Sequence, residues 1–201
     1  MSRQVSCPTC GAPLTIENAF TKFIVCQYCG QSLAVLDTGV DPTGKVAKLA
    51  EYPSRLSVGA HGSLKGQGFR VLGRVRYSSV DGFWDDWYIQ MDDGKMGWIT
   101  EDEGDLTFVS KTTLTVPVPP FDQVRVGGFL SFGSDRLFVS EKGQSRVLGS
   151  EGQLPYAAAP DRPVAYINGN AGGKAIQLML DGDAIRLNTG VPLEFRDVTV
   201  S

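Results

Sequence analysis

The chain has 201 residues, which is enough for one large or two small folded units. Its 19 basic and 22 acidic side chains give a net charge of −3, so no global charge draws it to nucleic acid or to an anionic lipid surface. Hydrophobic residues make up 42% of the chain, which excludes wholesale disorder. The 24 Gly and 11 Pro are typical of a chain with many tight turns, and they favour short strands over long helices.

The sequence carries few signals for targeting or for catalysis. No apolar run is long enough to cross a membrane, and the first 21 residues lack the apolar region of a signal peptide, so we expect a cytoplasmic protein without a membrane span. The single histidine, His61, lies among glycines, and we expect it in a surface loop. Ser–His–Asp or Cys–His catalysis would have to use this one side chain.

All four cysteines lie in the first 29 residues and form two C-x-x-C pairs. They are Cys7, Cys10, Cys26 and Cys29. Two such pairs can supply four thiolates to one tetrahedral Zn²⁺, and a glycine follows each pair, where a positive φ closes the turn. Disulfides would suit an exported chain, a redox pair would need a βαβ context, and rubredoxin-like iron is a third alternative. The pattern predicts a zinc ribbon over residues 1–36, with one structural zinc per chain, because no ligand position is left for water.

Residues 37–54 are polar and rich in turn formers, so we expect a linker, with one or two helical turns around Val46, Leu49 and Ala50. Within it, residues 39–46 nearly spell a phosphate-binding P-loop. The pattern fails at Val46, where a Ser or Thr hydroxyl should coordinate Mg²⁺, and no alternating strand–helix pattern follows. Nucleotide binding is therefore not expected.

The rest of the chain has the alternation of strands, and we expect a first β unit over residues 55–116. Residues 69–77 predict a half-buried strand with Arg70, Arg74 and Arg76 on its outer face. Residues 87–91 and 96–100 flank an Asp-Gly turn, which is a strong hairpin signal. Residues 106–109 complete a four-stranded bent meander or small barrel.

A proline-rich stretch at residues 117–120 interrupts this pattern, so we expect a second antiparallel β unit over residues 121–201. Turn signals at 133–134, 142–143 and 181–183 separate its apolar runs. Residues 56–59 and 124–127 open the two units alike, which hints at a duplication. The predicted fold class is mainly β: an N-terminal zinc ribbon followed by two small antiparallel β units.

The most unusual stretch is residues 81–105, which holds all three tryptophans and nine acidic side chains against one lysine, a net charge of −8. One interpretation is a binding surface, because aromatic anchors ringed by carboxylates suit a cationic peptide or a polyamine. Its candidate residues are Trp84, Asp85, Asp86, Trp87, Asp92, Asp93 and Trp98. A second interpretation is a carboxylate pair for acid–base chemistry, such as Asp85 with Asp86. In the third, the tryptophans are core, the acids occupy hairpin tips, and the arginines of residues 69–77 neutralise them.

A resemblance to a known family rests on five short motifs. They are Gly73-x-Val75-x-Tyr77, Trp84-Asp85-Asp86-Trp87-Tyr88-Ile89, Asp93-Gly94, Gly97-Trp98-Ile99 and Gly152-Gln153-Leu154-Pro155. They resemble the bacterial domain of unknown function 4178, over roughly residues 56–195, and members of that family frequently carry such a ribbon. Two residues depart from the motifs of that family: Asp86 stands at a position where the family more usually has Glu, and Gln153 stands where the family has Glu in its Gly-Glu-Leu-Pro motif. The family has no assigned enzymatic activity to carry over; its members resemble accessory proteins encoded near membrane-stress and polyamine-synthesis functions, which implies an adaptor or ligand-binding role.

Two functions from different classes follow as hypotheses. The first is a non-enzymatic adaptor that binds a protein partner, accessory to a membrane-stress system. The alternative is a protein, or an enzyme, that takes a small cationic ligand such as a polyamine on the acidic Trp-rich segment. Nucleic acid is not an expected partner, because residues 1–50 carry four basic against three acidic side chains.

Overall fold

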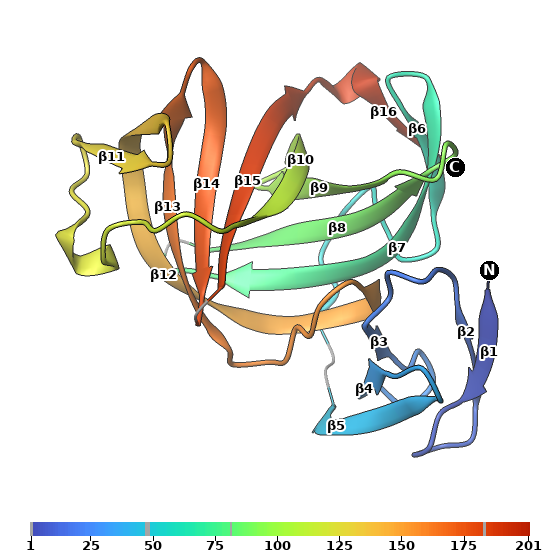
Figure 1. The fold of residues 1–201 in the computed structure, drawn as a ribbon. Helices are drawn as coiled ribbons and strands as arrows, with labels where there is room; N and C mark the ends of the chain where they lie inside the picture. The colour runs from blue at the N-terminus through green and yellow to red at the C-terminus, as the bar shows by residue number, and fades with distance from the viewer. Residues whose placement is uncertain (1, 47–48, 81, 183) are drawn as a thin grey trace.

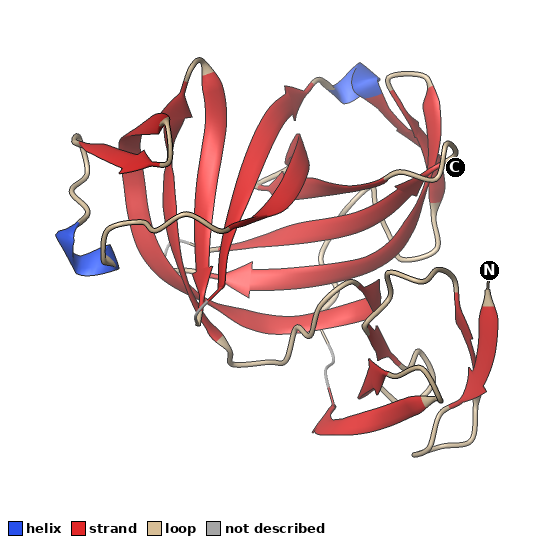
Figure 2. Ribbon diagram, viewed as in Figure 1, coloured by secondary structure: helices blue, strands red, loops and turns tan. Residues whose placement is uncertain are grey.

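The structure is a computed structural model that describes residues 2–46, 49–80, 82–182 and 184–201. Within these ranges the chain folds into sixteen strands and two short 3-10 helices, Phe121–Gln123 and Phe195–Asp197, which confirms the mainly β class (Figure 2). No helix in the described ranges is long and apolar enough to cross a membrane.

Five short strands form the N-terminal, cysteine-bearing region, which we call the ribbon. They are β1 (Arg3–Ser6), β2 (Pro13–Ile16), β3 (Phe23–Val25), β4 (Gln31–Val35) and β5 (Val40–Val46). The two hairpins β1–β2 and β3–β4 carry the two cysteine pairs, and β5 pairs with β4. Strand β5 therefore occupies part of the expected linker. The helical turns expected around residues 46–50 include residues 47 and 48, which lie outside the described residues.

Eight antiparallel strands close into a barrel (Figure 1). In chain order they are β7 (Gln67–Ser78), β8 (Phe83–Met91), β9 (Met96–Asp102), β10 (Asp105–Leu114), β12 (Asp135–Leu154), β13 (Pro163–Ala171), β14 (Lys174–Asp181) and β15 (Ala184–Leu193). Three further strands, β6 (His61–Leu64), β11 (Phe129–Phe132) and β16 (Val198–Val200), extend the sheet beside it.

The closed barrel corrects the expectation of two separate β units. Strands β7 to β10 and strands β12 to β15 do form two meanders, and the proline-rich stretch lies between them. However, β10 pairs with β15 along nine residue positions, and β7 pairs with β12. Each meander alone would leave two open edges, and pairing with the other meander removes them.

Strand β12 also differs from expectation, because the predicted turn at residues 142–143 is a continuous part of this 20-residue strand. Gly143 stands where a Cβ would lie 2.5 Å from the hydroxyl oxygen of Tyr166 on β13. The glycine thus allows close packing and does not mark a turn. Residue 183 of another expected turn, at 181–183, lies outside the described residues.

Hydrophobic side chains pack on both faces of the barrel wall. The inner face carries aromatic residues such as Tyr77, Trp84 and Trp98. On the outer face of β7–β9, Trp87 and Ile89 pack under β6 and β16, and on the outer face of β12–β14 a third cluster packs under residues 116–132. Hydrophobic side chains therefore line the barrel inside and cover it outside on two sides.

Candidate metal centre and candidate binding cavity

The four cysteines form a compact cluster whose sulfur atoms all lie within 4.8 Å of one another. The Sγ atoms of Cys7 and Cys29, and those of Cys10 and Cys26, are 3.8 Å apart. A tetrahedron with metal–sulfur bonds of about 2.3 Å has edges of about 3.8 Å. The cluster therefore fits one tetrahedral metal ion held by four thiolates, with no disulfide among these residues.

Two glycine turns hold the cysteine pairs in this geometry. The amides of Gly11 and Gly30 donate 2.8 Å hydrogen bonds to the carbonyls of Cys7 and Cys26, and each glycine has a φ of 74°. Only glycine adopts this φ without steric cost. Burial raises the pKa of Cys7, but backbone amides of Cys10 and Thr9 outweigh it, so the pKa is lowered to about 7.

The ribbon docks directly on the barrel. Strand β3 pairs with the end of β12, where Ile24 lies opposite Gln153. The buried side chain of Gln153 makes three hydrogen bonds to the ribbon. Its Oε1 accepts from the backbone N–H of Glu17 (2.8 Å) and from the Thr21 hydroxyl (3.2 Å), and its Nε2 donates to the backbone carbonyl of Thr15 (3.1 Å). Phe23 and Val25 belong to the same hydrophobic cluster as the barrel's inner face. A cleft of about 920 Å³ remains beside this contact.

The acidic Trp-rich segment does not form one exposed surface. Trp84, Trp87 and Trp98 are 8%, 1% and 5% exposed, and Asp85 and Asp86 are buried as well. Successive residues of a strand point to opposite faces, so Trp84, Asp86 and Trp98 face into the barrel while Asp85 and Trp87 face outward. Of the seven candidate residues, Asp92 and Asp93 are the exposed ones, at the β8–β9 turn. Asp81 lies outside the described residues.

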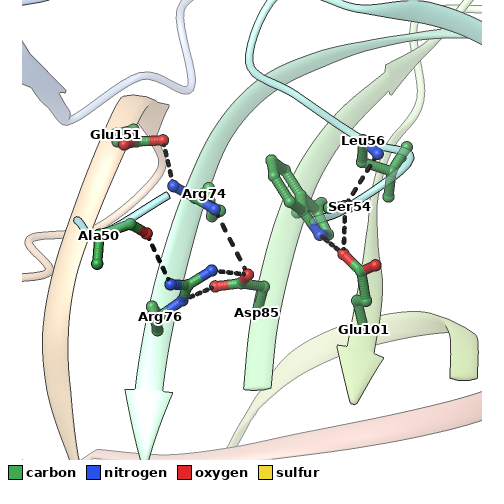
Figure 3. Close-up of polar contacts among 9 residues, drawn as sticks. Ala50, Ser54, Leu56, Arg74, Arg76, Asp85, Glu101 and Glu151 are labelled. Carbon is green, nitrogen blue, oxygen red and sulfur yellow. Dashed lines mark hydrogen bonds and ion pairs between the residues drawn. The ribbon is translucent and has the colours of Figure 1, made fainter. Parts of the chain in front are cut away.

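Asp85 sits in a buried ion cluster on the outer face (Figure 3). It accepts two hydrogen bonds, at 2.8 and 2.6 Å, from Arg76, which is directly opposite on β7. Arg74 lies 3.5 Å from the same carboxylate and 2.7 Å from Glu151. The segment 50–56 covers this cluster, because Arg76 donates to the Ala50 carbonyl (3.0 Å).

The other candidate carboxylates have separate partners. On the inner face, Asp86 accepts a 2.6 Å hydrogen bond from Thr100 and pairs with the Lys111 ammonium. At the β8–β9 turn, hydrogen bonds from Lys95 lower the pKa of Asp93 to about 2. Neutralisation by the facing strand therefore accounts for Asp85, as the third interpretation expects for Arg74 and Arg76. Arg70 instead pairs with Glu17 of the ribbon, at 3.2 Å.

A cavity of about 810 Å³ opens at the barrel end where β8 begins and β9 ends. Its walls combine aromatic rings with carboxylates. The rings are Tyr52, Phe83, Trp84 and Tyr166, and the carboxylates without an ion pair among the described residues are Glu101, Asp102, Glu103 and Glu141. No Lys, Arg or His is found among the described residues that line it. We call this site the acidic mouth.

The carboxylates around Asp102 at the acidic mouth repel one another. Burial raises the pKa of Asp102, and so do the nearby carboxylates of Glu103, Glu141 and Asp105. Glu141 accepts hydrogen bonds from the Tyr166 hydroxyl (2.8 Å) and the Asn168 amide (3.0 Å), which fix its orientation. Such a site favours a cation, because a cation would relieve the repulsion between the carboxylates.

The sequence matches the family described as "Domain of unknown function (DUF4178)" over residues 57–176, more than half of the chain. The chain belongs to this family. No match was found among curated proteins or among solved structures.

The DUF4178 motifs now have structural roles. Tyr77, Trp84 and Trp98 build the inner core, and Gly152 takes a φ of 69° where β12 turns toward the ribbon. The matched range ends inside β14, so β15, which closes the barrel, lies beyond it.

Sequence reasoning missed Glu101, Asp102, Glu103 and Glu141 as a group. The first three lie in the acidic segment, but the distant Glu141 joins them only through the barrel register. One signal in the sequence could have pointed to the first three residues: no Lys or Arg lies within residues 96–110 to pair with them.

Proposed function

We propose that this protein binds a small cationic ligand at the acidic mouth of its barrel, without catalytic turnover. One observation carries the proposal: four carboxylates without ion-pair partners surround an aromatic-walled cavity of about 810 Å³. That volume lies in the range of small-molecule sites, and aromatic faces beside carboxylates favour an organic ammonium group. This observation supports the alternative hypothesis from the sequence, a small cationic ligand. The carboxylates involved are those of the acidic mouth and not the aspartates that the sequence analysis selected.

We further propose that the ribbon holds one structural Zn²⁺ per chain and that the protein works in the cytoplasm. Four thiolates fill the tetrahedron and leave no open position for chemistry. Four cysteines without a disulfide suit a reducing compartment. Metal analysis of the purified protein should give one zinc per chain.

The adaptor hypothesis remains a second candidate, because the ribbon exposes two large aromatic side chains, Phe20 (61%) and Tyr28 (62%). Single exposed aromatics often anchor protein contacts. If the ribbon recruits a partner, replacing both residues by Ala should abolish partner capture while zinc content stays at one per chain.

The cation proposal is tested with hexylamine as the probe, followed by NMR or calorimetry. Asp102→Asn should weaken hexylamine binding about fivefold, because one attractive carboxylate is lost. The same change should raise thermal stability, since the ionised Asp102 is disfavoured by burial and by its acidic neighbours.

The pH dependence follows the same logic. The folded protein holds the Asp102 proton more tightly than the unfolded chain, so protonation stabilises the fold as the pH falls through this raised pKa. Protonation also removes the charge that attracts the amine, so hexylamine affinity should rise with pH over the same range and fall with salt. Asp92→Asn, in an exposed turn outside the cavity, is the matched control. Equal binding of neutral hexanol would refute the proposal.

A further inference from the structure

A row of polar side chains crosses the inner wall of the barrel beside the acidic mouth. Five residues on five neighbouring strands stand directly opposite one another in the register: Glu141, Asn168, Gln177, Asn188 and Lys111. Residues directly opposite in antiparallel strands point to the same face. This face also carries Tyr166 and Met179 of the inner core. The row therefore leads from the mouth into the barrel.

Hydrogen bonds divide this row into two pairs. The side-chain Nδ2 of Asn168 donates to the Glu141 carboxylate at 3.0 Å, and the side-chain Nδ2 of Asn188 donates to the side-chain Oε1 of Gln177 at 2.9 Å. Asn168 and Gln177 both line the cavity and stand directly opposite each other on β13 and β14. Lys111 turns away from the row toward Asp86, with its ammonium 4.2 Å from the ring centre of Trp98.

Asn188 has an unused acceptor. Its side chain is buried, with 4% exposure, and its Oδ1 atom has no hydrogen-bond partner among the described residues. Buried acceptors are almost always paired, because water has been removed from them. Asn188 does not itself line the cavity, but its side-chain amide is bonded to Gln177, which does, so the unused acceptor belongs to the side-chain pair at this wall of the cavity.

We infer that the ligand has two different ends: an ammonium group held by the carboxylates of the mouth, and a neutral hydrogen-bond donor, a hydroxyl or amide N–H, that binds Asn188 and Gln177. This inference rests on the proposed cation function and names the ligand class. A second ammonium is disfavoured at the inner end, because the carboxylates there, Asp86 and Asp181, are already paired with Lys111 and Arg186. Burying a further charge there without a free carboxylate is costly.

Three probes of equal chain length separate the possibilities: aminohexanol, hexylamine and hexanediamine. On the full-length, metal-loaded protein we expect aminohexanol to bind about five- to tenfold more tightly than hexylamine, as one added hydrogen bond predicts. Hexanediamine should bind no more tightly than hexylamine. Asn188→Ala should remove the preference for aminohexanol and leave hexylamine binding unchanged. Asn170→Ala, an exposed residue of β13 outside the row, should keep the preference.

The outcomes distinguish the two proposals. Equal affinities for aminohexanol and hexylamine would overturn the two-ended ligand while the cation function stands, and Asn188 Oδ1 would then be bound to a buried water. Tightest binding of hexanediamine would overturn it in favour of a dicationic ligand. If no amine binds, both proposals fail. The comparison of probes on the unmodified protein decides the matter even if Asn188→Ala does not fold.

Discussion

Asp85 and Asp86 are adjacent in sequence but serve different parts of the molecule. Asp85 points outward, where it holds Arg76 in a bidentate pair beneath residues 50–56. Asp86 points inward, where it holds Thr100 and Lys111 in the barrel. Each carboxylate has an oppositely charged partner that is itself buried. Removing either carboxylate would leave a buried cation without a counter-charge.

Asp85→Asn should therefore be strongly destabilising, by about 3–5 kcal/mol, because Arg76 would keep its buried position without a carboxylate and Arg74 would keep only Glu151. Urea denaturation measures this loss. Asp93→Asn is the matched control, because Asp93 is an exposed turn residue whose ion pair with Lys95 is also exposed, and its replacement should change stability little. Similar midpoints for the two variants would contradict the buried-cluster account.

At this scale the sequence was only partly informative. The C-x-x-C spacing predicted the four clustered cysteines, because a local pattern determines that geometry. Alternation in residues 69–77 predicted a strand, but not that the arginine face is buried. That face is covered by residues 50–56, and local alternation carries no information about a distant covering segment.

Two hairpin turns of the barrel share one uncommon geometry. In the β9–β10 turn, Glu103 and Gly104 have φ values of 50° and 91°, and in the β6–β7 turn, Lys65 and Gly66 have 49° and 84°. Two residues with positive φ match the twist of a hairpin, and Asn-Gly is the preferred pair. A glutamate in the first position is strained, and Glu103 also belongs to the acidic mouth.

Glu103→Asn should relieve this strain and raise stability by up to about 1 kcal/mol, while it weakens hexylamine binding. Lys65→Asn is the matched control, since it repairs the same turn geometry away from the cavity. Thermal melting and hexylamine titration of both variants check the prediction. We expect both to melt higher and only Glu103→Asn to lose affinity; unchanged affinity in Glu103→Asn would remove Glu103 from the site.

Most barrel strands were predictable as elements, because their alternation and turn residues are local. The error in β12 has a specific cause, since Gly143 is needed for the approach of Tyr166 and not for a turn. Barrel closure was not predictable either. The pairing of β10 with β15 joins residues about 80 positions apart, and edge matching of that kind leaves no local pattern.

The ribbon and the barrel share one hydrophobic cluster. Phe23 and Val25 of the ribbon are 1% and 7% exposed, and they pack in the cluster that includes Val147 and Leu154 of β12. The linker expected over residues 37–54 therefore does not keep the two parts from contacting each other. Each of the two ribbon side chains contributes about 1.5–3 kcal/mol by burial.

Removal of the metal should consequently weaken the barrel. The ribbon is too small to stay folded without metal, so a chelator should withdraw Phe23 and Val25 from the barrel and lower its stability by about 3 kcal/mol. Tryptophan emission during urea unfolding measures the barrel alone, because all three tryptophans lie in residues 84–98. Cys10→Ser should reproduce the shift, and the chelator should add nothing to it. An unchanged emission midpoint would show that the two parts are independent.

Closure of the barrel by β15 also sets an order of events during synthesis. The four thiolates are complete at residue 29, but β15 ends only at residue 193. At a ribosomal rate of about 5–20 residues per second, roughly 10–30 seconds separate the two points. The ribbon can take its metal during that interval, while Phe23, Val25 and the edge of β7 wait for β12, which ends at residue 154, and the edge of β10 waits for β15. The nascent chain thus has a complete metal site before its barrel is closed. During this interval its exposed apolar side chains and unpaired strand edges are the groups that a chaperone would cover.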